Sequence, residues 1–318
     1  MATKETILKL SIVLFFGLVV AMSGCVSQPK QQQQQQQLSK TFVGGTKGLE
    51  LSFLEGQPPA QVIAGTEFPI TIRLVNDGEG ALQKITGDVY GFVEIQGIDT
   101  QSFQTDRYKT ITEDITPKKK VGNSTVPGGM AELTWTPTAP KITGASQDYP
   151  LLAKLIYGYK TTAVGVACLK QNLIAQATGG KELCKISGTI QVASSSGPIQ
   201  VTSIEESPSG FQIKIKNSGT GYPFYNSVEF KDYKESEINT TTKNYVYLSS
   251  VKLGDEDITN NCTSRKIYIP PSAGETTFFC SYKTTGAAAE VVKQLTIELT
   301  YGYVNSIQTK FTVLSYEE

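Results

Sequence analysis

The sequence contains no histidine, which excludes the Ser-His-Asp and Cys-His nucleophile systems and every His-ligated metal site. The commonest general base near neutral pH is therefore missing as well. We expect a protein that is not an enzyme and that requires neither a cofactor nor a metal. A surface hydrolase that uses only carboxylates is the catalytic alternative that this composition leaves open.

An excess of charge of either sign is also missing, because 29 Lys and Arg residues balance 29 Asp and Glu residues. Nucleic-acid binding requires a basic face, so we expect no nucleic-acid partner. Hydrophobic residues make up 39% of the 318 residues and charged residues 18%, which is typical of a folded globular protein. A chain of this length suggests about two domains.

The N-terminus has the pattern of a secretory signal peptide. Lys4 and Lys9 precede an uncharged apolar stretch over residues 10–22. This stretch is short for a membrane-spanning helix, which needs about 20 residues. The sequence Met22-Ser-Gly-Cys25 follows and resembles the lipobox of prokaryotic lipoproteins, including archaeal ones. The resemblance implies that residues 1–24 are a signal peptide and that Cys25 is lipidated. An uncleaved anchor helix is the alternative, and both interpretations place the rest of the chain at the extracytoplasmic face of the cell membrane.

The segment that follows the anchor is of low complexity and polar. It includes seven consecutive glutamines at 31–37 and offers nothing to bury in a core. We interpret residues 25–46 as a lipidated cysteine followed by a flexible linker that separates the folded part from the membrane.

The rest of the chain shows the alternation of β-strands. Apolar residues occupy every second position from Phe68 to Leu74, and a turn sequence follows at Asn76-Asp-Gly78. Such a strand buries one face and exposes the other. Similar features recur in the same order and at nearly the same spacing, namely Phe211 to Gly219 after Phe68 to Gly78, Pro270 to Phe278 after Pro127 to Trp135, and Leu299 to Tyr303 after Leu155 to Tyr159. The repetition predicts two tandem domains, residues 47–195 and 198–318.

Short alternating strands and turn clusters predict an all-β fold in which each domain is an antiparallel β-sandwich of immunoglobulin-like type. The pattern is similar to the adhesion-related, immunoglobulin-like modules of prokaryotic surface proteins. That resemblance implies a fold and a cell-surface setting, and it carries over no catalytic residues. The two Tyr-Gly-Tyr sequences, residues 157–159 and 301–303, are interpreted as core-packing residues rather than as a binding site.

Four cysteines remain once Cys25 is assigned to lipid. Pairing within each predicted domain, Cys168 with Cys184 and Cys262 with Cys280, requires no bridge across the predicted linker and is therefore expected. An exported chain favours disulfide bonds. A site that holds a metal with four cysteines is the alternative, although the chain lacks any Cys-x-x-Cys pair.

Three sequons predict that the protein is a glycoprotein. Asn123, Asn239 and Asn261 each begin an Asn-x-Ser/Thr triplet within a polar, turn-like stretch. Two other segments have alternative interpretations. Residues 254–260 form either an acidic turn or a calcium loop, and the aromatic stretch 222–233 either packs in the core or forms a platform for sugars or a partner chain.

These observations predict a lipid-anchored cell-surface protein that serves adhesion, envelope organisation or assembly. Its expected partners are the membrane, through the N-terminal lipid, and other surface proteins or glycans, which it contacts through loops or strand edges. The alternative is a surface lipoprotein that captures a polysaccharide or a solute.

Overall fold

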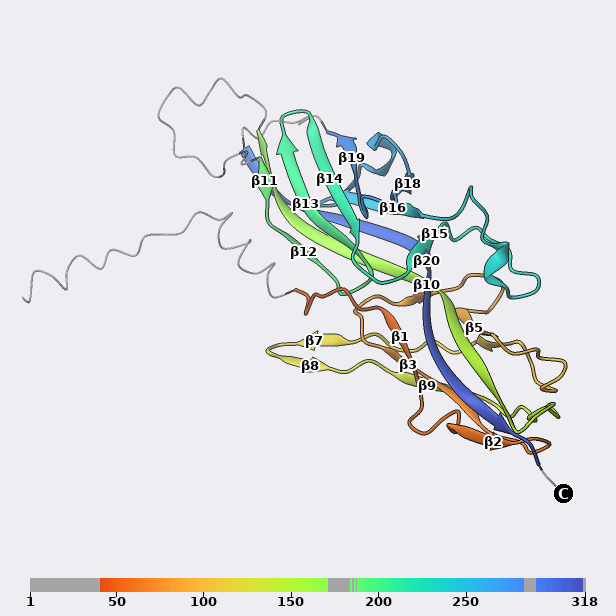
Figure 1. Ribbon diagram of the computed structural model, residues 1–318. Helices are drawn as coiled ribbons and strands as arrows, with labels where there is room; N and C mark the ends of the chain where they lie inside the picture. The colour runs from red at the N-terminus through yellow and green to blue at the C-terminus, as the bar shows by residue number, and fades with distance from the viewer. Residues whose placement is uncertain (1–40, 171–183, 185, 187, 283–289, 317–318) are drawn as a thin grey trace, which may run out of the picture.

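The computed structural model describes residues 41–170, 184, 186, 188–282 and 290–316 (Figure 1). Its regular elements are β-strands and short 3-10 turns, which confirms the predicted all-β class. None of the helical segments in these ranges has the length and apolar character needed to cross a membrane.

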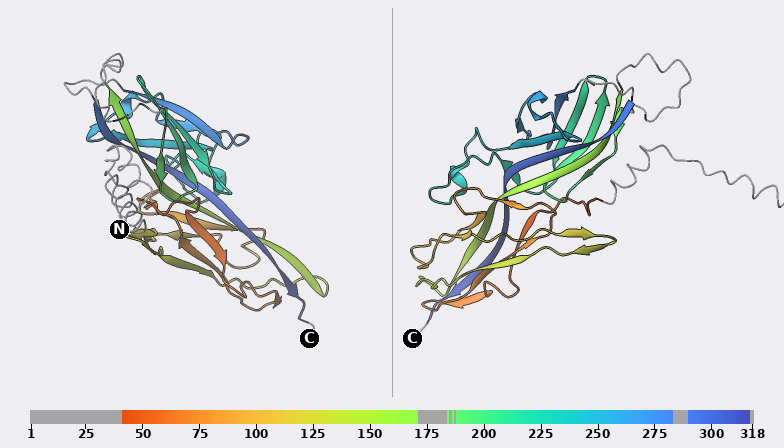
Figure 2. Two further views of the ribbon diagram at one scale, coloured as in Figure 1. Left: turned by 90° about the vertical axis from the view of Figure 1, so that its left-hand side faces the viewer. Right: turned by 180° about the vertical axis from the view of Figure 1, so that it is seen from behind.

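Two exceptionally long strands form the spine of the molecule. Strands β10 (Ser146–Lys170) and β20 (Glu290–Leu314) each contain 25 residues and pair antiparallel over their whole length, from Ser146 opposite Leu314 to Lys170 opposite Glu290. The centre of the register is the pair Gly158 and Gly302. Both strands extend from one end of the elongated molecule to the other (Figures 1 and 2), and we call the region around the glycine pair the waist.

Lobe 1 lies on one side of the waist and consists of two facing sheets. One sheet has the order β1-β3-β9. The other combines the first half of β10 with the second half of β20, the strands β5 and β6 beyond β10, and β2 paired in parallel with the end of β20. The bounds are β1 (Leu49–Phe53), β2 (Gln61–Ile63), β3 (Ile70–Asn76), β4 (Leu82–Gln83), β5 (Gly91–Gln96), β6 (Tyr108–Ile111) and β9 (Met130–Trp135).

Lobe 2 repeats this arrangement on the other side of the waist. One sheet has the order β11-β13-β14-β19, and the other combines the remaining halves of β10 and β20 with β16 and its short partners β17 and β18. The bounds are β11 (Thr189–Ile190), β12 (Val192–Ser194), β13 (Ile199–Ser207), β14 (Gly210–Asn217), β15 (Tyr222–Phe224), β16 (Tyr245–Leu253), β17 (Glu256–Asp257), β18 (Lys266–Tyr268) and β19 (Glu275–Ser281). The turns η2 (Glu235–Glu237) and η3 (Thr259–Asn261) lie in its loops, and a separate hairpin, β7 (Lys119–Val121) with β8 (Ser124–Val126), extends from lobe 1.

The alternation of the strands places the core between the facing sheets. In lobe 1, Ile70 and Ile72 of β3 are buried in the same apolar cluster as Leu151 and Leu155 of β10. That cluster continues through the waist into lobe 2. A second cluster forms on the opposite face of the long strands, where Phe92, Ile156 and Val304 are covered by Phe224 and Phe230 and their neighbours.

The waist contains the same arrangement of hydrogen bonds twice, and we call each copy a waist lock. The Asn76 amide donates to the carbonyl of Gly80, whose N–H donates to the Tyr159 hydroxyl at 3.0 Å. In the other half, Asn217 donates to the carbonyl of Gly221, whose N–H donates to the Tyr303 hydroxyl, also at 3.0 Å. Each lock joins the turn after a central strand to the tyrosine of a long strand, and this accounts for the repeated Asn-x-Gly and Tyr-Gly-Tyr sequences.

The strand pairing connects the two halves of the sequence more closely than a simple tandem arrangement does. Residues 304–314 of β20 pair with β10 and β2 in lobe 1, and residues 159–170 of β10 pair with β20 and β12 in lobe 2. The division at 195–198 and the immunoglobulin-like type of the sandwiches stay predictions. The register shows that each lobe contains half of a strand from the other half of the chain.

The chain enters the described structure at the waist. The Glu79 carboxylate accepts hydrogen bonds from the N–H groups of Val43, Gly44 and Ser196 at 2.8–2.9 Å. The Lys120 ammonium donates to the carbonyl of Phe42 at 3.1 Å. The last residues of the predicted linker, 42–44, are therefore held between the two lobes and not at either tip.

Candidate functional site

The predicted disulfide bonds are both present. Cys168 bonds to Cys184 and Cys262 bonds to Cys280, with sequence separations of 16 and 18. Both pairings agree with the sequence-based expectation. Cys25, the signal peptide and the glutamine tract lie outside the described residues, so their assignments stay predictions.

All three sequon asparagines are exposed. Asn123 lies in the turn between β7 and β8, Asn239 follows η2, and Asn261 ends η3 beside the second disulfide bond. The Asn239 side-chain oxygen accepts hydrogen bonds from the N–H and hydroxyl of Thr241. Their exposure makes them accessible to modification, and their glycosylation stays a prediction.

The Tyr-Gly-Tyr side chains are core residues, as the sequence suggested. Tyr157, Tyr159, Tyr301 and Tyr303 are at most 2% exposed, and burial holds the pKa of each hydroxyl above its usual value. Within the aromatic stretch 222–233, Phe224 and Phe230 are likewise buried in the second cluster. None of these six rings is available to a ligand.

The acidic segment 254–260 behaves as a turn. Asp257 accepts hydrogen bonds from the N–H and hydroxyl of Thr259, and Glu256 lies 3.8 Å from the Lys293 ammonium. Across the parts of the chain that the structure covers, no three His, Cys, Asp or Glu side chains gather closely enough to hold a metal ion.

The candidate site is a surface on lobe 2, and Tyr225 of the predicted aromatic stretch 222–233 is its one member that the sequence singled out. We call it the tyrosine–cation surface. It is formed by the strand pair β16 and β18 and by the residue that follows β15. Its members are Tyr225, Tyr245, Tyr247, Arg265, Lys266 and Tyr268.

Strand alternation produces this surface. Val246 and Leu248 of β16 and Ile267 of β18 point into the core and are at most 5% exposed. The residues between them must therefore point outward. Tyr245 lies opposite Tyr268 and Tyr247 lies opposite Lys266 in the antiparallel register. Two cross-strand pairs, each with at least one tyrosine, are therefore neighbours on the outward face of the two strands.

The rings and cations form a continuous layer. Tyr245 and Tyr268 have ring centroids 5.0 Å apart, and Tyr225 and Tyr247 have centroids 5.7 Å apart. The Lys266 ammonium lies 4.6 Å from the Tyr245 ring centroid and 5.0 Å from that of Tyr225. The Arg265 guanidinium lies 5.0 Å from the centroid of Tyr247. Cations over ring faces are attracted by the aromatic quadrupole, which orders these long side chains.

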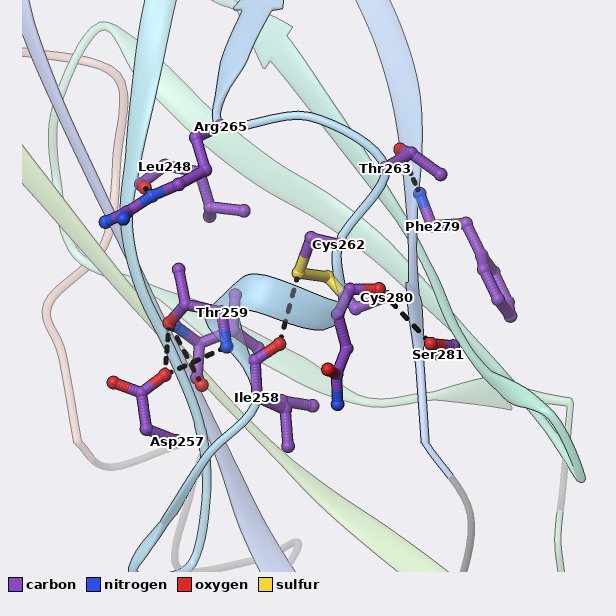
Figure 3. The surroundings of a disulfide bond; sticks show 12 residues. Leu248, Asp257, Ile258, Thr259, Cys262, Thr263, Arg265, Phe279, Cys280 and Ser281 are labelled. Atoms are coloured by element: carbon purple, nitrogen blue, oxygen red, sulfur yellow. Dashed lines mark hydrogen bonds between the residues drawn. A yellow bond between two sulfur atoms is a disulfide. The ribbon is translucent and has the colours of Figure 1, made fainter.

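The second disulfide bond holds the segment that supplies the cations. Cys262 bonds to Cys280 of β19 only a few residues before Arg265, and the Arg265 Nε donates to the carbonyl of Leu248 at 3.3 Å (Figure 3). The hydroxyl of Thr263 accepts from the N–H of Phe279 beside the bridge (Figure 3). The loop from β17 to β18 is thus attached to β19 of one sheet and to β16 of the other.

No family model matches the chain, and no curated protein matches its sequence. The available sequence signal was the alternation in Tyr245-Val-Tyr and Lys266-Ile-Tyr, in which aromatic residues occupy the positions that a half-exposed strand turns to solvent.

A concave site lies on lobe 1. It has a volume of about 380 Å³ and is lined mainly by polar side chains, including Thr100, Gln101, Asp106 and Lys109. Trp135 also lines it, is 1% exposed, and has an indole N–H with no hydrogen-bond acceptor in the described structure. An unsatisfied buried donor is unusual, and this one belongs to a residue of the cavity wall although its nitrogen is itself buried.

Proposed function

We propose that the protein is a membrane-anchored cell-surface lipoprotein that acts without catalysis in adhesion, envelope organisation or assembly, through protein contacts. In this proposal the lipidated Cys25 and the linker tether two tandem, extracellular, immunoglobulin-like β-sandwiches, and glycans on the sequons decorate them. The partner is another protein of the cell surface.

The observation that supports the proposal is the tyrosine–cation surface. Tyrosine and arginine are enriched at the centres of protein interfaces, where they contribute most of the binding energy. Here four tyrosines and two cations are grouped on the strand pair β16 and β18 and on the residues that adjoin β15 and β18, and Tyr268 is 43% exposed. A preordered surface loses little side-chain entropy when it binds.

Site-specific photocross-linking tests this proposal. Full-length protein with a photoreactive phenylalanine derivative at position 268 is expressed on the source cells, which are then irradiated, and the products are purified. One abundant surface protein, recovered near one to one, is the expected result. The matched control carries the same group at Val126, which is 49% exposed on the β7–β8 hairpin. Equal products from both positions, or none from position 268, would contradict the proposal.

Capture of a soluble ligand is the second candidate, and the Trp135 cavity supports it. The unused indole N–H and the surrounding hydroxyl, amide and charged groups suit a polar ligand such as a sugar. Trp135→Phe keeps most of the ring and removes the donor. If an array of neutral oligosaccharides identifies a ligand, this variant is expected to bind it about tenfold more weakly, because the lost hydrogen bond contributes about 1 kcal/mol or more.

A further inference from the structure

The cations of the tyrosine–cation surface form no salt bridge among the described residues, although Arg265 adds to the hydrogen bonds from Thr259 that lower the pKa of Asp257. Arg265 and Lys266 are exposed, and neither forms an ion pair with any Asp or Glu in the described ranges. Each makes hydrogen bonds only to backbone carbonyls, Lys266 to Thr241 at 2.7 Å and Arg265 to Leu248 and Ser249. These bonds leave several N–H donors of both groups directed away from the protein.

The same imbalance extends past the six residues. The Lys243 ammonium lies 4.1 Å from the ring centroid of Tyr222, on the strand that precedes Tyr225, and it also has no ion-pair partner at salt-bridge distance. In contrast, Lys154, Lys160 and Lys214 elsewhere on the molecule all pair with glutamates. Three cations that form no salt bridge within the described residues, Lys243, Arg265 and Lys266, therefore lie against this group of tyrosines.

The position of the cations also decides which anionic partner fits. Sugar rings stack on flat, open aromatic faces, but Lys266 lies over the faces of Tyr225 and Tyr245, and the adjacent ring pairs are inclined at 49°. The surface offers charged N–H donors and four tyrosine hydroxyls. None of these four hydroxyls is hydrogen-bonded within the described structure. Carboxylates accept from such donors in charge-assisted hydrogen bonds, and Arg binds them in a bidentate manner.

We infer that the surface partner contacts the tyrosine–cation surface through an acidic polypeptide segment, with Asp or Glu carboxylates on Arg265 and Lys266 and with its backbone or aliphatic groups against the tyrosines. This inference rests on the proposed function and specifies the chemistry of the partner. Electrostatic complementarity of this kind increases the association rate and selects among partners. Binding weakens as the salt concentration rises, because exposed charges are screened.

The test is a titration of the detergent-solubilised full-length protein with poly-L-glutamate at low and physiological salt. The parent protein is expected to bind, with an affinity that falls as salt rises. The variant R265E/K266E is expected to bind at least about tenfold more weakly. The matched control K141E/K216E reverses two exposed lysines that lie on other faces and is expected to bind like the parent. A second variant, R265Q/K266Q, removes the charges without introducing new ones and is expected to lose binding too. It tests the inference even if the charge-reversed variant misfolds.

Three results would overturn the inference: no binding of poly-L-glutamate, equal loss in the control, or binding of polygalacturonate as tight as that of poly-L-glutamate, which would indicate an acidic glycan. The photocross-linking experiment separates this inference from the proposed function. If R265E/K266E still yields the cross-linked partner from position 268, the protein contact stands and the acidic segment is refuted. If no partner is recovered even from the parent protein, the proposed function itself fails.

Discussion

At the scale of single residues, Glu79 connects three parts of the chain that are distant in sequence. Its carboxylate accepts from Val43 and Gly44 near the end of the predicted linker and from Ser196 between the repeats. Hydrogen bonds to a charged acceptor are among the stronger ones in proteins. Any force on the predicted lipid tether would therefore reach the folded body at the waist, through this carboxylate.

Replacement of Glu79 by alanine should release the entering segment. We expect a loss of about 2 kcal/mol in unfolding free energy, because three N–H groups lose a charged acceptor in a partly solvated site. Residues 41–47 should also be cut faster in limited proteolysis. Urea unfolding and mass analysis of the fragments measure both effects. Glu113→Ala, at an exposed carboxylate, is the control, and equal behaviour of the two variants would contradict this role of Glu79.

Glu206 makes the stability depend on pH. Burial raises the pKa of its carboxyl group to about 7, and the hydrogen bond from the N–H of Cys168 only partly opposes this rise. The folded state therefore favours the protonated form. Its contribution to stability is present below about pH 4.5, the pKa expected for the unfolded chain, and it is lost as the pH rises through 7.

Glu206→Gln should remove this dependence while it keeps an oxygen acceptor for Cys168. At pH 8 the variant is expected to be more stable than the parent by on the order of 1–2 kcal/mol, a value reduced for residual solvation of the group. At pH 4 the two should be nearly equal. Urea unfolding at both pH values measures the difference, and Glu205→Gln at the exposed neighbouring position is the control. A parent protein that becomes more stable as the pH rises from 5 to 8, while E206Q does not, would refute the argument.

At the scale of the elements, the central glycine pair allows β10 and β20 to cross the waist. A methyl group on Gly302 would lie 2.0 Å from the Phe224 ring, and one on Gly158 would lie 2.2 Å from the carbonyl oxygen of Gln83. Phe224 is fully buried, so it cannot move aside without disturbing the second cluster. A residue without a side chain is required where these elements approach the long strands.

Gly302→Ala should therefore destabilise the protein by about 1–3 kcal/mol through overpacking. The double variant G302A/F224A should be less unstable than the sum of the two single changes, because removal of the ring relieves the clash. Unfolding free energies of the four proteins of this cycle, measured in urea, give the coupling. Strict additivity would mean that the ring and the introduced methyl group do not meet.

At the scale of the whole molecule, the shared strands make each lobe depend on the other half of the sequence. Phe311 and Val313 of β20 are at most 1% exposed within lobe 1, and the Phe311 ring lies 5.1 Å from that of Phe68. A fragment that ends before the second repeat lacks these side chains and leaves one edge of β10 unpaired.

We therefore expect the intact protein to unfold in one transition, with the same midpoint by circular dichroism and by the fluorescence of Trp135, its single tryptophan. Fragments 41–197 and 198–316 should each fail to give a cooperative transition when they are expressed alone, and should recover one when they are mixed. A fragment 41–197 that unfolds cooperatively on its own would instead support two independent domains.

Local properties of the protein follow directly from its residue pattern. Alternation of apolar residues specifies which face of a strand is buried, and this predicted the all-β class and the inward positions of β3 and β14. The two disulfide pairs followed from proximity along the chain and the export signal. Repeated sequences such as Asn76-Asp-Gly and Asn217-Ser-Gly indicated repeated turns, which the two waist locks now explain.

The pairing of the strands with one another becomes visible only in the folded molecule. Backbone hydrogen bonds between strands are nearly independent of side-chain identity, so alternation specifies a buried face but not a neighbour. For this reason the sequence did not reveal that β10 and β20 run through both lobes. Nor did it reveal that the Tyr225 ring contacts the Tyr247 ring and the Lys266 ammonium, which come from two other segments of the chain. The candidate site exists because nonlocal pairing brings outward-facing positions of different strands to one surface.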